Sequence, residues 1–178
     1  MNKTLIFTSA IILFFGCSSQ NEHFIQSENY YYQYINKYNQ MEIDSIIQYN
    51  DYTIVFAWTE WCKASHNQIN EYLIPFLQKN YANIGVISIC CADPKKLVEF
   101  LEKNDYKYPV YLLSSWKGLD KWRLNSRFHA LFDGYKSANY VPIVILTNAQ
   151  KQILNLDTIN GEYRGIGSTI LEIKNKFN

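Results

Sequence analysis

The sequence predicts an α/β fold, and three stretches of the chain carry that prediction. An apolar run over residues 53–58 ends in a Trp-Cys segment and is followed at once by a sequence that favours a helix. A second apolar run, 84–89, precedes Asp93-Pro94, an acid and proline pair that favours a helix start. A third, 143–146, follows a proline directly. Buried strands alternating with helices are typical of a central sheet with both faces covered.

The segment at the end of the first run contains the candidate nucleophile. Residues 58–65 read Trp-Thr-Glu-Trp-Cys-Lys-Ala-Ser, which places Cys62 at the start of the predicted helix. Unpaired backbone N–H groups and the helix dipole favour the thiolate of a cysteine at that position. Because the thiolate is the form that attacks a disulfide, the sequence predicts a nucleophilic Cys62. The alternative is a small, half-buried cysteine on an inactive scaffold.

This segment resembles the Trp-Cys-x-x-Cys motif of the thioredoxin superfamily, which lies between a central strand and a long helix. The resemblance implies a thioredoxin-like three-layer α/β/α sandwich with a mixed central sheet over residues 41–178. Ser65 stands where the superfamily has its second cysteine, so Cys62 and Ser65 form a Cys-x-x-Ser motif. A serine hydroxyl cannot expel the partner from a mixed disulfide. The motif therefore permits monothiol chemistry, with resolution by another thiol.

Val141-Pro142 resembles a second signature of the same superfamily, a proline that opens a strand through a cis peptide bond. The resemblance implies that the Val141 backbone lies beside Cys62, where an extended substrate can pair with it in β fashion. A trans proline at the first residue of a strand is the alternative. The resemblance also places Trp58 and Trp61 around the nucleophile as an apolar platform for substrate. For Trp58, plain packing in the core is the alternative.

The remaining elements follow from hydrophobic periodicity and turn residues. The sequence predicts helices over 41–49, 62–80, 94–103, 119–132 and 168–177, and further strands over 108–113 and 153–157. Pro75 should bend or break the second helix, whose buried side is expected to carry Ile69, Tyr72, Leu73, Phe76 and Leu77. The tyrosine-rich segment 31–38 favours either a first helix or an edge strand.

Two adjacent cysteines, Cys90 and Cys91, lie at the end of the second predicted strand. Side chains alternate in direction along a strand, so one of these two cysteines should face the core and the other should face the opposite side of the sheet. They are either small buried apolar residues or a resolving thiol for Cys62. His66, four residues after Cys62, could contribute to a metal site with a remote ligand, but the metal-binding relatives it would resemble have two motif cysteines. We therefore expect no metal and no cofactor.

The first residues of the chain are expected to be a signal. Lys3 precedes a short apolar segment, 5–15, and Gly16-Cys17 is followed by polar residues. This resembles a bacterial lipoprotein signal, which implies a signal peptide over 1–16, cleavage before Cys17 and lipid on that cysteine. Residues 17–40 would then be a tether and tyrosine-rich lead-in. Plain secretory cleavage and an uncleaved anchor are the alternatives, and all three export the domain.

Charge narrows the choice of partners. The chain carries a formal net charge of +1 and no basic cluster, which argues against nucleic acid as a partner. We expect an exported, membrane-tethered thiol–disulfide oxidoreductase or isomerase of the bacterial cell envelope, acting on protein thiols or disulfides with an external thiol reductant. The alternative is a redox-inactive thioredoxin-like binding or chaperone module. Phe56 occupies the place of a buried acid common in the superfamily, which favours the alternative.

Overall fold

The computed structural model describes residues 29–79, 81, 83–115, 118–156, 158–159, 162–163 and 165–177. The predicted signal peptide over 1–16, the lipidation site Cys17 and the first part of the tether lie outside these residues. Within the described ranges, every helix is too short or too polar to cross a membrane.

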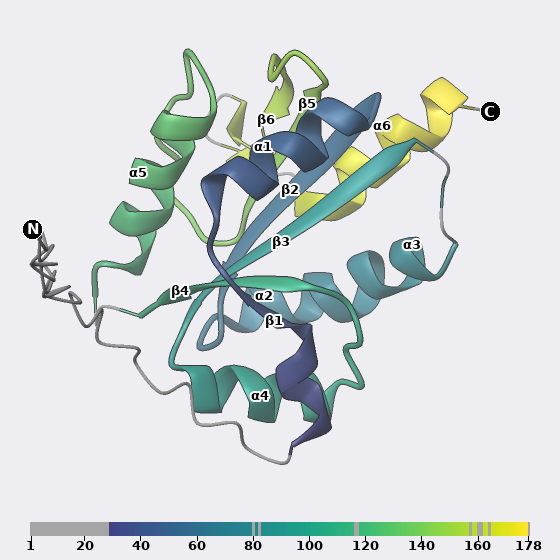
Figure 1. The fold of residues 1–178 in the computed structure, drawn as a ribbon. Helices are drawn as coiled ribbons and strands as arrows, with labels where there is room; N and C mark the ends of the chain where they lie inside the picture. The colour runs from purple at the N-terminus through teal and green to yellow at the C-terminus, as the bar shows by residue number, and fades with distance from the viewer. Residues whose placement is uncertain are drawn as a thin grey trace, which may run out of the picture.

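A mixed sheet of six strands forms the centre of the molecule (Figure 1). In spatial order the strands are β1 (Ile35–Lys37), β4 (Val110–Ser114), β3 (Ile84–Ala92), β2 (Tyr52–Thr59), β5 (Ile143–Asn148) and β6 (Ile153–Leu156). Neighbouring strands from β1 to β2 are parallel, whereas β5 is antiparallel to both β2 and β6. The predicted parallel pairing of the first two buried strands is confirmed, with Ala57 opposite Ile89.

Helices cover both faces of this sheet. One face is covered by α1 (Gln40–Tyr49) and α5 (Asp120–Leu131), and the other by α2 (Lys63–Gln68), α3 (Ile74–Gln78), α4 (Pro94–Lys103) and α6 (Gly165–Phe177). Alternate residues of β2 supply the two cores: Val55 and Ala57 pack toward α1 and α5, and Phe56 and Trp58 pack toward the opposite helices. The three-layer α/β/α sandwich predicted from the sequence is confirmed.

The long helix predicted over 62–80 is one helical run that changes type in the middle. A π-helical segment, Ile69–Leu73, joins α2 to α3 and ends two residues before Pro75. Because proline has no N–H and its ring crowds the preceding turn, the wider π turn lets the helix continue. The predicted break is therefore absent. Ile69, Leu73 and Phe76 are buried as expected, but Tyr72 is 44% exposed, so the expectation for Tyr72 was wrong.

The tyrosine-rich segment forms both structures that its sequence allowed. A 3-10 helix, Tyr30–Tyr34, leads into β1, whose Ile35 is opposite Val110 of β4 at the edge of the sheet. The sheet thus includes residues from the predicted lead-in, and the folded unit begins before Met41. A two-stranded hairpin of β7 (Thr158–Ile159) and β8 (Glu162–Tyr163) was not predicted, and Asp157 lies outside the described residues.

Candidate functional site

Cys62 lies where β2 gives way to the helical run. The strand ends at Thr59, and the Cys62 N–H donates to the Thr59 carbonyl at 3.2 Å to close a turn. Cys62 is the N-cap residue of α2 in extended conformation, and its own carbonyl accepts the first helical bond, from the His66 N–H at 3.2 Å. Its thiol is partly exposed and free. The predicted placement of the cysteine at a helix start is confirmed.

The Val141-Pro142 segment lies against this thiol. The Cys62 thiol donates to the Val141 carbonyl oxygen, with Sγ and O 3.3 Å apart. The Val141–Pro142 peptide bond is cis, so the trans alternative is wrong. Pro142 is buried and Val141 is half-buried. The segments from the two sequence signatures therefore meet in space.

Ser65 lies one helical turn after Cys62 and is completely buried. Within the described residues, its hydroxyl has no hydrogen-bond partner. A buried hydroxyl without a partner destabilises the folded state. An apolar or thiol side chain of similar size at this position would remove that destabilisation. The position of the missing second cysteine is therefore internal, beneath the surface that carries Cys62.

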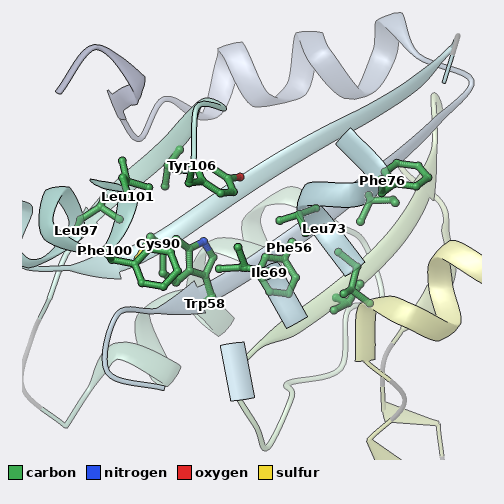
Figure 2. Close-up of a cluster of buried hydrophobic side chains, with 14 of the residues drawn as sticks. Phe56, Trp58, Ile69, Leu73, Phe76, Cys90, Leu97, Phe100, Leu101 and Tyr106 are labelled. Carbon is green, nitrogen blue, oxygen red and sulfur yellow. The ribbon is translucent and has the colours of Figure 1, made fainter. Parts of the chain in front are cut away.

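The two motif tryptophans have opposite environments. Trp61 is 63% exposed at the surface beside Cys62. Trp58 is fully buried, its indole N–H donates to the Ser88 hydroxyl at 2.9 Å, and its ring packs against Phe100 with the centroids 4.8 Å apart (Figure 2). Trp58 therefore cannot form part of a surface platform. The expectation that it contacts substrate is corrected to the alternative, packing in the core.

Sequence reasoning missed two residues that contact the site, Asp120 and Ser115. The indole N–H of Trp61 donates to Asp120 Oδ2 at 3.1 Å, and the Ser115 hydroxyl lies 3.1 and 3.0 Å from the two carboxylate oxygens of Asp120. Both come from the segment that follows β4 and begins α5, more than fifty residues after the motif. They line a cavity of about 640 Å³ together with Trp61 and Glu60. An aspartate at a helix start was the only sequence signal, and it also marks ordinary helix termini.

Glu60 and His66 lie two residues before and four residues after Cys62 in the chain. Burial raises the pKa of the Glu60 carboxyl, and the nearby Asp120 carboxylate raises it further. The His66 Nε2 lies 2.6 Å from the Glu60 carbonyl oxygen, so this nitrogen carries a proton and donates. Its ring also packs against Phe100, with the centroids 4.5 Å apart. Across the described ranges, His, Cys, Asp and Glu side chains form no group of three or more suited to a metal ion.

Cys90 and Cys91 face opposite sides of the sheet, as predicted. Cys90 packs in the core beneath α4, and Cys91 in the core beneath α5, and both are free and fully buried. Burial raises the pKa of the Cys91 thiol to about 12 and the pKa of the Cys90 thiol well above its ordinary value. Thiols in this state are poor nucleophiles and cannot reach a mixed disulfide at the surface unless the core opens. The arrangement supports the alternative of small buried side chains.

Solved structures share this architecture. A thiol:disulfide interchange protein of the thioredoxin family from Chlorobium tepidum superposes with a TM-score of 0.52 at 14% identity, covering 73% of this chain and 81% of that chain. A DsbF homologue from Corynebacterium diphtheriae superposes with a TM-score of 0.50 at 19% identity, covering 71% and 73%. The fold is thioredoxin-like. No protein-family profile and no curated protein sequence matches the chain.

At these identities the likeness concerns the thioredoxin-like fold, and the candidate chemistry depends on the residues of this chain. Four of the predicted site residues lie together at one end of the sheet: Cys62, Trp61, Val141 and Pro142. Ser65 lies directly below, and Trp58, Cys90 and Cys91 are in the core. The arrangement offers one accessible thiol, one exposed indole and one backbone carbonyl at the same surface.

Proposed function

We propose that the chain is an exported thiol–disulfide oxidoreductase or isomerase that acts on protein cysteines through a single nucleophile, Cys62. The observation that carries this proposal is the 3.3 Å contact between the Cys62 sulfur and the Val141 carbonyl. It brings a partly exposed thiol at a helix start next to backbone that an extended polypeptide can pair with. The Chlorobium tepidum neighbour described above is, by its name, a thiol:disulfide interchange protein.

The first step of the proposed reaction is attack on a substrate disulfide. The Cys62 thiol first releases its proton to solvent. The thiolate then bonds to one substrate sulfur as the substrate S–S bond breaks, and the leaving thiolate takes a proton from solvent. Deprotonation of the thiol also ends its hydrogen bond to the Val141 carbonyl. That carbonyl then becomes available to a backbone N–H of the bound polypeptide.

The second step needs another thiol, because Ser65 cannot supply one. In isomerisation, a free thiol of the same substrate attacks the mixed disulfide and releases Cys62 as thiolate. In net reduction, an external dithiol attacks the Cys62 sulfur and releases the second substrate thiol. The second thiol of the reductant then attacks the reductant sulfur that is bonded to Cys62, which forms a disulfide within the reductant and frees Cys62. The reductant thus loses the two electrons that the substrate gains.

We further propose that the domain is held at a membrane of the bacterial cell envelope by lipid on Cys17, with residues after Cys17 as a tether. The supporting observation is the Lys3, apolar segment and Gly16-Cys17 order of the sequence. Metabolic labelling with a palmitate analogue tests this, with Cys17→Ala as the comparison. Labelling of the wild type but not of Cys17→Ala supports the lipid anchor. Equal labelling of the two proteins contradicts it.

A redox-inactive binding or chaperone module is the second candidate, favoured by Ser65 and by Phe56 in place of an acid. Trapping mixed disulfides separates the two. Cells that express the wild type or Cys62→Ala are quenched with acid and alkylated, and adducts are resolved on non-reducing gels. We expect adducts that depend on Cys62 and that persist in a Cys90→Ala/Cys91→Ala variant. If the wild type forms no Cys62-dependent adducts while still binding unfolded polypeptide, the binding module is the function.

A further inference from the structure

The exposed indole beside the reacting cysteine is held by a hydrogen bond to a carboxylate. Trp61 is 63% exposed, so packing against the protein covers little of it. Its Nε1–H donates to Oδ2 of Asp120 at 3.1 Å. Hydrogen bonds to a charged acceptor are stronger than those between neutral groups. This bond therefore restricts a side chain that would otherwise sample several rotamers at the surface.

The Asp120 carboxylate is itself firmly placed. It is only 2% exposed, and the Ser115 hydroxyl lies within hydrogen-bond distance of both its oxygens. The Asp120 backbone carbonyl accepts a weak bond from the Cys91 thiol, with S and O 3.9 Å apart. Asp120 also lies in the first turn of α5, where the helix dipole stabilises a negative charge. Ser115, directly after β4, and Cys91 of β3 thus contact the residue whose carboxylate holds Trp61.

Building on the proposed thiol–disulfide function, we propose that Asp120, seated by Ser115, is a positioning residue that holds the Trp61 indole beside Cys62 and thereby favours disulfides in polypeptides over small disulfides. A polypeptide on either side of the disulfide can lie against the indole, whereas a small disulfide that reaches the sulfur has no such segment. A side chain already fixed in place loses less conformational entropy when a partner binds. Exposed aromatic residues of this kind are frequent anchors in binding surfaces.

The test compares two substrates of the same reduced protein. One is 2-hydroxyethyl disulfide, and the other is a short peptide joined to 2-mercaptoethanol by a mixed disulfide at a central cysteine. The ratio of the two second-order rate constants cancels any effect of a variant on the reactivity of the Cys62 thiolate itself. We expect Asp120→Ala to lower the peptide-to-small-disulfide ratio about tenfold, the scale of one hydrogen bond to a charged group. Asp133→Ala, which removes an exposed carboxylate near the end of α5, should leave the ratio unchanged.

A double-mutant cycle shows whether Asp120 acts through the indole. Trp61→Phe keeps an aromatic ring but removes the N–H donor, so it should lower the ratio as Asp120→Ala does. Adding Asp120→Ala to Trp61→Phe should then change nothing further. Where Asp120→Ala does not fold, Ser115→Ala and Asp120→Asn take its place; Ser115→Ala should lower the ratio, and Asp120→Asn, which keeps an acceptor oxygen, should lower it less.

The outcomes distinguish this inference from the function on which it rests. A wild type that reacts with both disulfides, with a ratio unaffected by Asp120→Ala or by its substitutes, overturns the inference alone. Additive effects of Asp120→Ala and Trp61→Phe also overturn it, because they show that Asp120 acts by another route. A wild type that reacts with neither disulfide overturns the proposed function and the inference together.

Discussion

The Cys62 thiol donates a hydrogen bond to the Val141 carbonyl, and the two residues are separated by 79 positions in the chain. Each partner is placed by its own local structure. Cys62 is fixed by the turn at the end of β2 and the start of α2. Val141 precedes β5, which pairs with β2 along its length, so the two partners approach from neighbouring strands. The candidate site is therefore a product of the sheet register.

Asn125 fixes the segment that leads to Val141, and its loss should be costly. Its side-chain N–H₂ donates to the carbonyls of Lys121 and Ala138, and its side-chain oxygen accepts from the Tyr135 hydroxyl at 2.6 Å and the Ala138 N–H at 2.8 Å. Asn125→Ala takes this donor from the buried Ala138 carbonyl and leaves the Ala138 N–H with only its 3.2 Å bond to the Tyr135 hydroxyl. We expect it to lower the free energy of unfolding by about 2–4 kcal/mol, measured by urea denaturation.

The control for that prediction is Ser126→Ala. Ser126 is the next residue of α5 but is exposed, so its substitution should change the free energy of unfolding by less than about 0.5 kcal/mol. Equal effects of the two substitutions would contradict a specific role for the Asn125 hydrogen bonds.

Truncation of the two motif tryptophans should lower stability by very different amounts. Trp58→Ala removes a fully buried indole and leaves a cavity, so it should lower the free energy of unfolding by about 3–5 kcal/mol. Trp61→Ala removes a mostly exposed side chain, and water can reach the oxygen of Asp120 that the indole leaves. Its cost should be about 1 kcal/mol or less. Chemical denaturation of both variants checks this, and a Trp58→Ala protein as stable as Trp61→Ala would contradict the buried position of Trp58.

The sequence was sufficient for the parts of the site that depend on local patterns. An apolar run before Cys62 and a proline after Val141 indicate a strand end and a strand start by their residue types alone. The position of the helices and the opposite directions of Cys90 and Cys91 follow from the periods of helix and strand. Such features depend on residues near one another in the chain, which is why they could be predicted.

What could not be predicted depends on contacts between distant segments. The Trp61–Asp120 bond joins the turn after β2 to the start of α5, and neither residue carries a pattern that indicates the other. The motif alone does not show that Trp58 is buried and Trp61 exposed. The burial of Trp58 depends on α4, whose Phe100 packs against its ring. Likewise, an edge strand was one of the two structures predicted for residues 31–38, but its parallel pairing with β4 depends on a distant segment of the chain.

The buried thiols predict a loss of stability in alkaline solution. Burial raises the pKa of Cys91 to about 12 and the pKa of Cys90 well above its ordinary value, while in the unfolded chain both titrate near about 8.5. Above that pH the unfolded chain releases protons that the native protein keeps. The stability that the protonated buried thiols contribute is fully present below about pH 8.5. It is lost as the pH rises toward about 12, by up to about 1.4 kcal/mol of unfolding free energy per pH unit for each thiol.

Urea denaturation from about pH 7 to about pH 9.5 measures this slope, and a variant that lacks one thiol separates its part from that of tyrosines, whose ordinary pKa is about 10. Cys91→Ala is the matched variant: its cavity lowers stability at every pH, but its slope should be smaller than that of the wild type because one titrating thiol is gone. A free energy of unfolding that stays constant up to about pH 9.5, or a slope that Cys91→Ala leaves unchanged, would contradict the burial of these thiols.

Ser65→Cys should convert the monothiol site into a dithiol site. Ser65 is fully buried and its hydroxyl lacks a partner in the described part of the chain, so a thiol of similar size fits without loss of a hydrogen bond. Positions 62 and 65 are three apart at the start of a helix and therefore face the same side. The new thiol can attack a mixed disulfide on Cys62 within the same molecule.

In the wild type, a mixed disulfide on Cys62 should persist, because Ser65 cannot expel the bound partner. Ser65→Cys should shorten the lifetime of that adduct at least about tenfold, because an intramolecular thiol has a high effective concentration, and should create insulin reductase activity when a dithiol reductant is supplied. Ser65→Ala is the control: it removes the same hydroxyl but adds no thiol, so the adduct should last as long as in the wild type. An adduct that decays equally in all three proteins would mean that position 65 does not face the Cys62 sulfur, and the monothiol mechanism would lose its structural basis.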